Sequence, residues 1–159
     1  MMRGWFVGLA VALLAGGAAP AAGPGSPARP LKVENVTLRV LNRVFPDFRE
    51  EDTVRMREEF RVGDSQYTAK VVEFVPDFSL DLKNHRVVSR SNEPKNPAVR
   101  VIVKEKGVPR DTSWAFLNFA PHFATKNILG FQILRIEFLG RPPLVAPDTA
   151  AAHGAGARP

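Results

Sequence analysis

Residues 36–40 read Val36-Thr37-Leu38-Arg39-Val40, and this stretch decides the fold class. Every second side chain in it is aliphatic, and the side chains between them are polar. In an extended chain, a period of two places the aliphatic side chains on one face and the polar ones on the other. The stretch therefore predicts a strand with one face in a hydrophobic core and the other in water.

The same period recurs along the chain. It is clearest where Val99, Val101 and Val103 alternate with Arg100 and Lys104. In residues 55–62, Met56, Phe60 and Val62 should point inward, and Glu58 is an exception to the alternation. A last strand places Leu134, Ile136 and Phe138 on one face. Further strand candidates, which share the alternation or are rich in β-branched and aromatic residues, are residues 67–75, 85–91 and 112–119. About seven short antiparallel strands predict an all-β fold, either a β-sandwich or an open barrel.

Turn signals separate the predicted strands, whereas helix signals are few. Val62-Gly63-Asp64-Ser65 predicts a hairpin turn, and Gly107-Val108-Pro109 predicts the end of the strand that starts at Val99. Residues 47–54 are the best helical candidate, because Asp47 could cap a helix and Glu50 could answer it three residues later. A second helical turn is predicted near residues 121–127. Neither candidate is long enough to form a layer.

The two ends differ in composition from the middle. Arg3 precedes a short apolar block that ends in small residues, which is typical of a signal peptide over residues 1–22 with an A-x-A-like cleavage site at Ala19-Pro20-Ala21. The alternative is an uncleaved membrane anchor, although the block is shorter than the roughly 20 residues of a spanning helix. We expect a Pro/Gly linker at 23–30, a β-sandwich domain at 31–140 and a disordered tail at 141–159.

The whole-chain composition excludes several classes of function. The chain has no cysteine, which excludes disulfides, thiol catalysis and thiolate metal sites. The formal net charge is +6, but basic residues are scattered among acidic ones, so no nucleic-acid stripe is predicted. We expect membrane contact only through an uncleaved leader, and an exported location, either periplasmic or extracellular.

No catalytic or metal-binding residue is predicted. His85, His122 and His153 lack the spacing of metal ligands, and no G-x-S-x-G motif occurs. Adjacent carboxylates such as Glu58 and Glu59 point to opposite faces of a strand, which argues against a shared-proton dyad. The chain is therefore not expected to be an enzyme.

Aromatic residues gather between Trp114 and Phe131. The alternation places Trp114 and Phe116 on one face and Phe119 on the other, so one subset fills the core and the other is left for a second layer, a ligand groove or a partner. His122 is followed by Phe123 and could be an axial haem ligand, or simply a loop histidine beside packing aromatics. These residues are the candidate binding site: Trp114, Phe116, Phe119, His122 and Phe123.

Asn96 completes the set of candidates. It precedes Pro97, whose ring disfavours helical conformation at the asparagine. Its side-chain amide could bond neighbouring backbone groups and lock the start of the Val99 strand, or it could contribute to binding.

Several short motifs in this order resemble one known family. They are Gly63-Asp64, Tyr67 leading to Phe74-Val75-Pro76-Asp77-Phe78, Ser89-x-Ser91, Asn96-Pro97-Ala98 and Trp114-x-Phe116. Together they resemble the soluble extracytoplasmic β-domain of ResB-like cytochrome c biogenesis proteins over about half of the folded region. In that family the domain is attached to membrane helices and helps deliver haem to apocytochromes, and no second hydrophobic span accompanies it here. The family's membrane-embedded histidines have no counterpart in this chain.

Two functions follow as hypotheses. The first is an exported, non-catalytic β-domain that acts as a protein-interaction module in the cell envelope, with another envelope protein as its partner, no cofactor, and the link to cytochrome c biogenesis that the resemblance implies. The alternative is a small-ligand or haem-binding β-domain with an aromatic-lined pocket.

Overall fold

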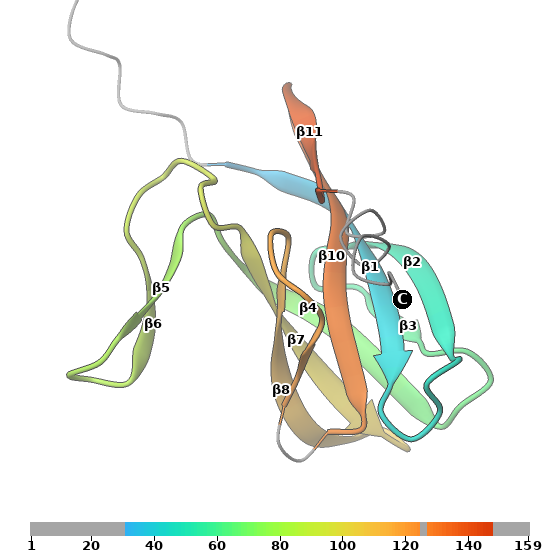
Figure 1. The fold of residues 1–159 in the computed structure, drawn as a ribbon. Coiled ribbons are helices and arrows are strands. Elements are labelled where there is room, and N and C mark those ends of the chain that lie inside the picture. Colours follow the sequence, from blue (N-terminus) through green and yellow to red (C-terminus); the bar gives the residue numbers. More distant parts are fainter. Residues whose placement is uncertain (1–30, 125–126, 148–159) are drawn as a thin grey trace, which may run out of the picture.

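A computed structural model describes residues 31–124 and 127–147, and these residues form strands and turns without a helix. Eleven strands occur in the described part of the chain (Figure 1). In chain order they are β1 (Val33–Asn42), β2 (Arg49–Arg55), β3 (Glu59–Arg61), β4 (Tyr67–Val75), β5 (Phe78–Asp81), β6 (Arg86–Ser89), β7 (Ala98–Glu105), β8 (Val108–Phe116), β9 (His122–Phe123), β10 (Leu129–Phe138) and β11 (Arg141–Val145). The predicted all-β fold is confirmed.

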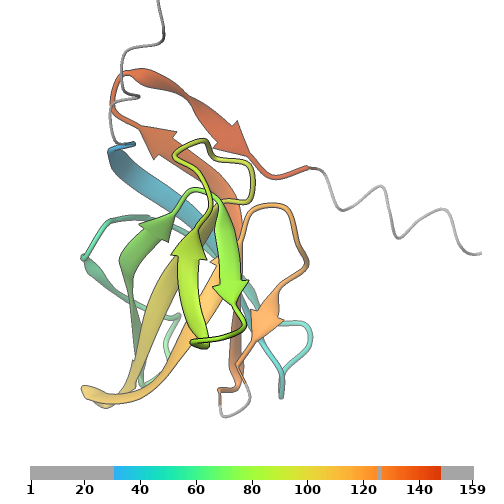
Figure 2. The same cartoon turned by 90° about the vertical axis from the view of Figure 1, so that its left-hand side faces the viewer.

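The strands form two packed sheets and a separate ribbon. The first sheet has the order β11-β10-β1-β2, with β9 also paired to β10, and the second has the order β3-β4-β7-β8. Strands β5 and β6 pair with each other as a two-stranded ribbon beside the second sheet (Figures 1 and 2). All these pairings are antiparallel. The architecture is that of a β-sandwich and not of a closed barrel.

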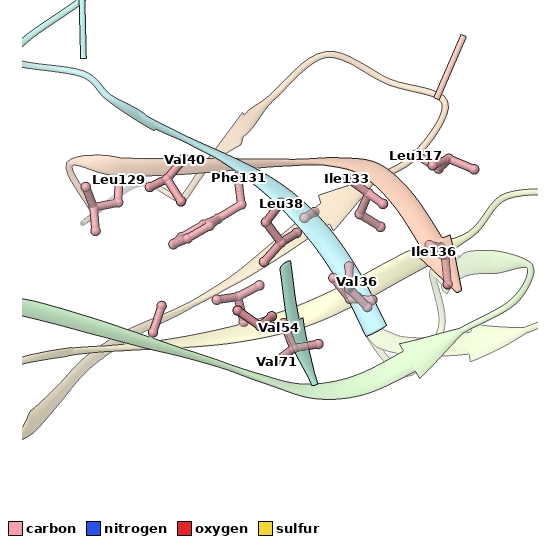
Figure 3. Close-up of a cluster of buried hydrophobic side chains, with 14 of the residues drawn as sticks. Val36, Leu38, Val40, Val54, Val71, Leu117, Leu129, Phe131, Ile133 and Ile136 are labelled. Carbon is pink, nitrogen blue, oxygen red and sulfur yellow. The ribbon is translucent and has the colours of Figure 1, made fainter. Parts of the chain in front are cut away.

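The core lies between the two sheets. Val36, Leu38 and Val40 on β1 are fully buried, as the alternation predicts, and they face Val71 of β4 across the sandwich (Figure 3). Phe131 is the largest fully buried side chain. The valines at alternate positions of β7 are also fully buried, so each sheet contributes one apolar face to a single core.

The helix expected at residues 47–54 is wrong, because most of this segment is β2. Its residues pair with β1 from Asn35↔Arg55 to Leu41↔Arg49, and this ladder outweighs the local capping pattern. The helical turn expected near 121–127 is also wrong where the chain is described, because His122 and Phe123 form β9.

The single strand expected at residues 55–62 is broken into two. The chain turns between β2 and β3, where Arg57 adopts a positive φ of 66°. Glu58 lies between the two strands, at this turn, which explains why it does not fit the alternation of the predicted strand. The hairpin turn predicted at Val62-Gly63-Asp64-Ser65 is confirmed, with Gly63 at a φ of 49° and the Ser65 amide donating to the Val62 carbonyl.

Strand β10 contains a bulge that changes which side chains face the core. Ile133 pairs with Leu38 and Arg135 pairs with Thr37, so Leu134 has no partner on β1. The alternation restarts after the bulge, which buries Ile133 and Ile136 and leaves Leu134 half-buried. The expectation that Leu134 shares a face with Ile136 is therefore wrong.

Two strand limits also differ from the prediction. Gly107 and Lys106 both have positive φ and form a two-residue hairpin turn, so β8 already starts at Val108, with Pro109 tolerated because β8 is an edge strand. Gly140 adopts a φ of 72° and reverses the chain into β11, so the folded region continues past residue 140.

The short strands explain why eleven are found where about seven were predicted. Strands of two to five residues, such as β9 and β11, are too short to show a period. The predicted signal peptide, linker and end of the tail lie outside the described residues and stay predictions.

Candidate functional site

The outer face of β8 presents two aromatic side chains away from the core. Ser113 and Ala115 are buried against the first sheet, so the alternating Trp114 and Phe116 point outward. Trp114 pairs with Arg100 of β7, and Phe116 pairs with Ala98. Both aromatic side chains are half-buried because the ribbon contributes a third ring.

That third ring is Phe78, the first residue of β5. Its ring meets Trp114 at 5.0 Å and Phe116 at 4.9 Å between centroids, both edge to face. Phe116 also contacts Phe119 at 5.8 Å and His122 at 6.2 Å. These geometries are the ones that aromatic pairs prefer. We call these five residues, Phe78, Trp114, Phe116, Phe119 and His122, the aromatic face.

The aromatic face is open to water at one end. Phe119 is 56% exposed and His122 is exposed, whereas Phe78 is half-buried. Phe119 follows the end of β8, where the alternation of a strand no longer applies. Its ring contacts Phe116. The expectation that Phe119 lies on the opposite face from Phe116 is therefore wrong.

Asn96 positions the backbone of Phe78. Its Nδ2 donates to the Phe78 carbonyl at 3.0 Å, while the Phe78 amide donates to the Asn96 carbonyl at 2.9 Å. The Asn96 amide donates in turn to the Pro76 carbonyl. One asparagine thus ties the start of β7 to the start of the ribbon and holds the Phe78 ring over β8.

Asp77 anchors the other strand of the ribbon. The residue is only 4% exposed, and its Oδ2 accepts a hydrogen bond from Ser91 Oγ at 3.1 Å. Its backbone amide donates to Ser89 Oγ, and the Arg90 guanidinium lies 3.6 Å from Oδ1. A buried carboxylate with these partners fixes the base of the ribbon, which is marginally stable as an isolated pair of strands.

Four of the six predicted site residues come together in this way. Trp114, Phe116, Phe119 and His122 belong to the aromatic face, and Asn96 is hydrogen-bonded to the backbone of Phe78 in that face. Phe123 does not belong to it, because its ring covers Gly130 and lies under the guanidinium of Arg43 at 5.3 Å. Sequence reasoning left Phe78 out of the site, since its contact with β8 joins residues far apart in the chain.

Two half-buried carboxylates on β2 share one face of the strand. Glu50 and Asp52 are two residues apart, so both point toward the inner face of the first sheet. Burial raises the pKa of both carboxyls, and the nearby charge of Asp52 raises the pKa of Glu50 further. Inward-pointing charges on an edge strand discourage pairing with another chain, which is a structural role.

The described residues contain a small hollow apart from the aromatic face. It has a volume of about 280 Å³ and lies between β11 and Pro94, lined mainly by apolar side chains such as Leu31 and Phe138. Within residues 31–124 and 127–147, no group of three or more potential metal-ligating side chains lies close together. No helix in these two segments could cross a membrane.

Comparison with protein-family models, curated proteins and solved structures finds no match for this chain. Most of the short sequence motifs named above meet in one place. Asp77, Ser89, Ser91 and Asn96 form the base of the ribbon, and Phe78 packs on the Trp114-x-Phe116 pair.

Proposed function

We propose that this protein is an exported, non-catalytic β-domain that binds another protein of the cell envelope through its aromatic face. The observation that carries the proposal is the open end of that face, where Phe119 is 56% exposed and in contact with Phe116. Aromatic side chains are enriched at the centres of protein interfaces, where they bury a large area at low entropic cost.

The leader and the resemblance support the rest of this proposal. A signal peptide at residues 1–22 would place the domain in the periplasm or outside the cell. A link to cytochrome c biogenesis rests on the resemblance to the ResB-like domain, because Phe78, Trp114 and Phe116 of the aromatic face belong to the motifs that carry it. Cell fractionation, together with the mass of the recovered protein, tests export and removal of the leader.

Site-specific photo-crosslinking in cells tests the interaction. A photoreactive phenylalanine analogue at position 119 should form a discrete adduct with one envelope protein, and Trp114→Ala should weaken the adduct. The same analogue at Phe45 is the matched control, because Phe45 is 64% exposed and lies in the β1–β2 loop. Identical adducts from both positions, or none from position 119, would contradict the proposal.

The alternative function, a small-ligand or haem-binding domain, is favoured by one observation. His122 is exposed and its ring lies against Phe116, so an imidazole stands at the open edge of an aromatic cluster. Titration with haem should then produce a Soret shift that His122→Ala abolishes. His85→Ala serves as the control, because His85 is an exposed histidine at the tip of the ribbon. A spectrum unchanged by added haem would rule out haem as the ligand.

A further inference from the structure

The β5–β6 ribbon has exposed apolar side chains, and one of them, Leu82, lies at its tip. The four-residue turn that joins β5 to β6 begins with Leu82, which is 77% exposed. Leu80 and Val88, on the adjoining strands, are also exposed. Three large aliphatic side chains in water within one short hairpin call for an explanation.

Two basic residues follow the leucine in the chain. Lys83 follows it directly and Arg86 begins β6, and neither forms an ion pair with any residue in 31–124 or 127–147. The one acidic residue nearby is Asp81, whose two carboxylate oxygens accept hydrogen bonds from the Lys83 amide at 2.9 Å and from Asn84 Nδ2 at 2.8 Å. Asp81 shapes the turn and is also the cross-strand neighbour of Arg86, but neither Arg86 nor Lys83 has an ion pair within the described residues.

The ribbon stands away from the sandwich. Figure 1 shows its turn well clear of the two sheets, and Figure 2 shows the ribbon in front of the second sheet. Its strands pair only with each other, apart from the contacts at its base through Asp77, Phe78 and Asn96. The tip is thus a narrow projection whose turn presents the exposed Leu82 beside Lys83, with Arg86 at the start of β6.

A partner must match both the shape and the charge of this projection. A stable protein interface buries roughly 800 Å² on each partner, which a single hairpin turn is too small to supply alone. A bilayer surface, in contrast, accepts individual apolar side chains at the boundary of headgroups and acyl chains, while its anionic phosphates attract lysine and arginine.

We propose that the tip of the β5–β6 ribbon docks on an anionic lipid surface, with Leu82 entering the headgroup region and Lys83 and Arg86 contacting phosphates. This contact is separate from the protein partner proposed for the aromatic face. It also departs from the expectation that the membrane is touched only through an uncleaved leader.

A fluorescent reporter at the tip separates this contact from binding through the leader. The chain has no cysteine, so Leu82→Cys in the full chain can be labelled uniquely with an environment-sensitive nitrobenzoxadiazole dye. Vesicles of phosphatidylcholine with phosphatidylglycerol should raise and blue-shift the emission, whereas phosphatidylcholine vesicles should do so much less. Phe45→Cys with the same label is the matched control and should not respond, because it lies in a loop elsewhere on the domain.

Charge variants test the role of the cations. Lys83→Gln and Arg86→Gln, in the labelled background, should each raise the lipid concentration for half-maximal response by roughly fivefold. Added salt should weaken the response of the parent more than that of the double variant. Circular dichroism of each variant checks that the sandwich is intact.

Three outcomes would overturn the proposal. The first is a silent label at position 82 while the chain sediments with anionic vesicles, since the leader alone would then hold the membrane. The second is an equal response at position 45. The third is a response at position 82 to delipidated envelope proteins but not to vesicles, which would identify a protein as the partner of the tip.

Discussion

Asn96 shows how one side chain can hold the aromatic face in place without belonging to it. Its amide and backbone groups bond to the backbone of Pro76 and Phe78, so the ring of Phe78 is held over Trp114. The sequence pointed to both a structural lock and a binding role for this residue. The hydrogen bonds favour the lock, because the side chain is directed at the protein's own backbone.

Asn96→Ala should therefore destabilise the domain. The substitution leaves the half-buried carbonyl of Phe78 without the donor Nδ2, which costs about 1–3 kcal/mol of the free energy of unfolding. Urea unfolding measures this cost. Asn118→Ala is the matched control, since the exposed Asn118 also donates one side-chain hydrogen bond to a backbone carbonyl, and its loss should cost less than about 0.5 kcal/mol. Equal costs for the two variants would contradict the role given to Asn96.

Glu50 makes the stability of the fold depend on pH. Burial, and then the charge of Asp52, raise the pKa of Glu50 above its ordinary value of 4.5. At pH values above 4.5, the Glu50 carboxyl is more often protonated in the folded state than in the unfolded state. The free energy of unfolding therefore falls as the pH rises through the pKa of the folded state. Glu50→Gln should accordingly stabilise the domain at about pH 7, and this gain should vanish near about pH 3.5, where both states are protonated.

Thermal unfolding at the two pH values measures the effect. Glu51→Gln is the control, because Glu51 is an exposed neighbour that forms an ion pair with Arg39 at 2.8 Å. Loss of this ion pair should make the Glu51→Gln variant slightly less stable than the parent at neutral pH. A gain for Glu50→Gln that is the same at both pH values would show that the carboxylate charge is not its cause.

At the scale of elements, the short strand β9 packs on β10 through the Phe123 ring, which covers Gly130. The Phe123 ring lies directly over Gly130, with the Arg43 guanidinium on the ring. A side chain at position 130 would occupy the place of this ring. The glycine is thus required by a close approach and not by an unusual backbone angle.

Gly130→Ala should displace β9. The new Cβ would lie 2.6 Å from the nearest carbon of the Phe123 ring, and relieving such overpacking costs about 1–3 kcal/mol. The same substitution in a Phe123→Ala background should cost much less, because the clashing ring is gone. A double-mutant cycle from chemical denaturation measures the difference, and additive costs would contradict the proposed clash.

At the scale of the whole molecule, the two sheets depend on one core. Phe131 is fully buried between them together with aliphatic residues from β1, β4 and β7. A single core shared by both sheets predicts one cooperative unfolding transition for the sandwich.

Phe131→Ala should lower the free energy of unfolding by about 3–5 kcal/mol, a large share of the stability of an ordinary domain. Calorimetry should show one transition in the parent and a strongly shifted one in the variant. Phe45→Ala, at a phenylalanine that is 64% exposed, should leave the transition nearly unchanged. Two separate transitions in the parent would contradict the single core.

The sequence by itself determined the features that depend on neighbours along the chain. The alternation in residues 36–40 and 99–103 was enough to assign strands and to identify buried faces, because the period of two is a property of the extended backbone. The turn at Gly63 followed in the same way from residues that tolerate positive φ.

Only the tertiary structure decided the features that depend on distant segments. Pairing with β1 made a strand of β2 where the local pattern favoured a helix, and the bulge at Leu134 shifted which side chains of β10 reach the core. The ring of Phe78 completed the aromatic face from a separate ribbon. The physical reason is common to all three, because a ladder, a bulge or a ring contact gains its free energy from a partner whose position is set only when the sheets assemble.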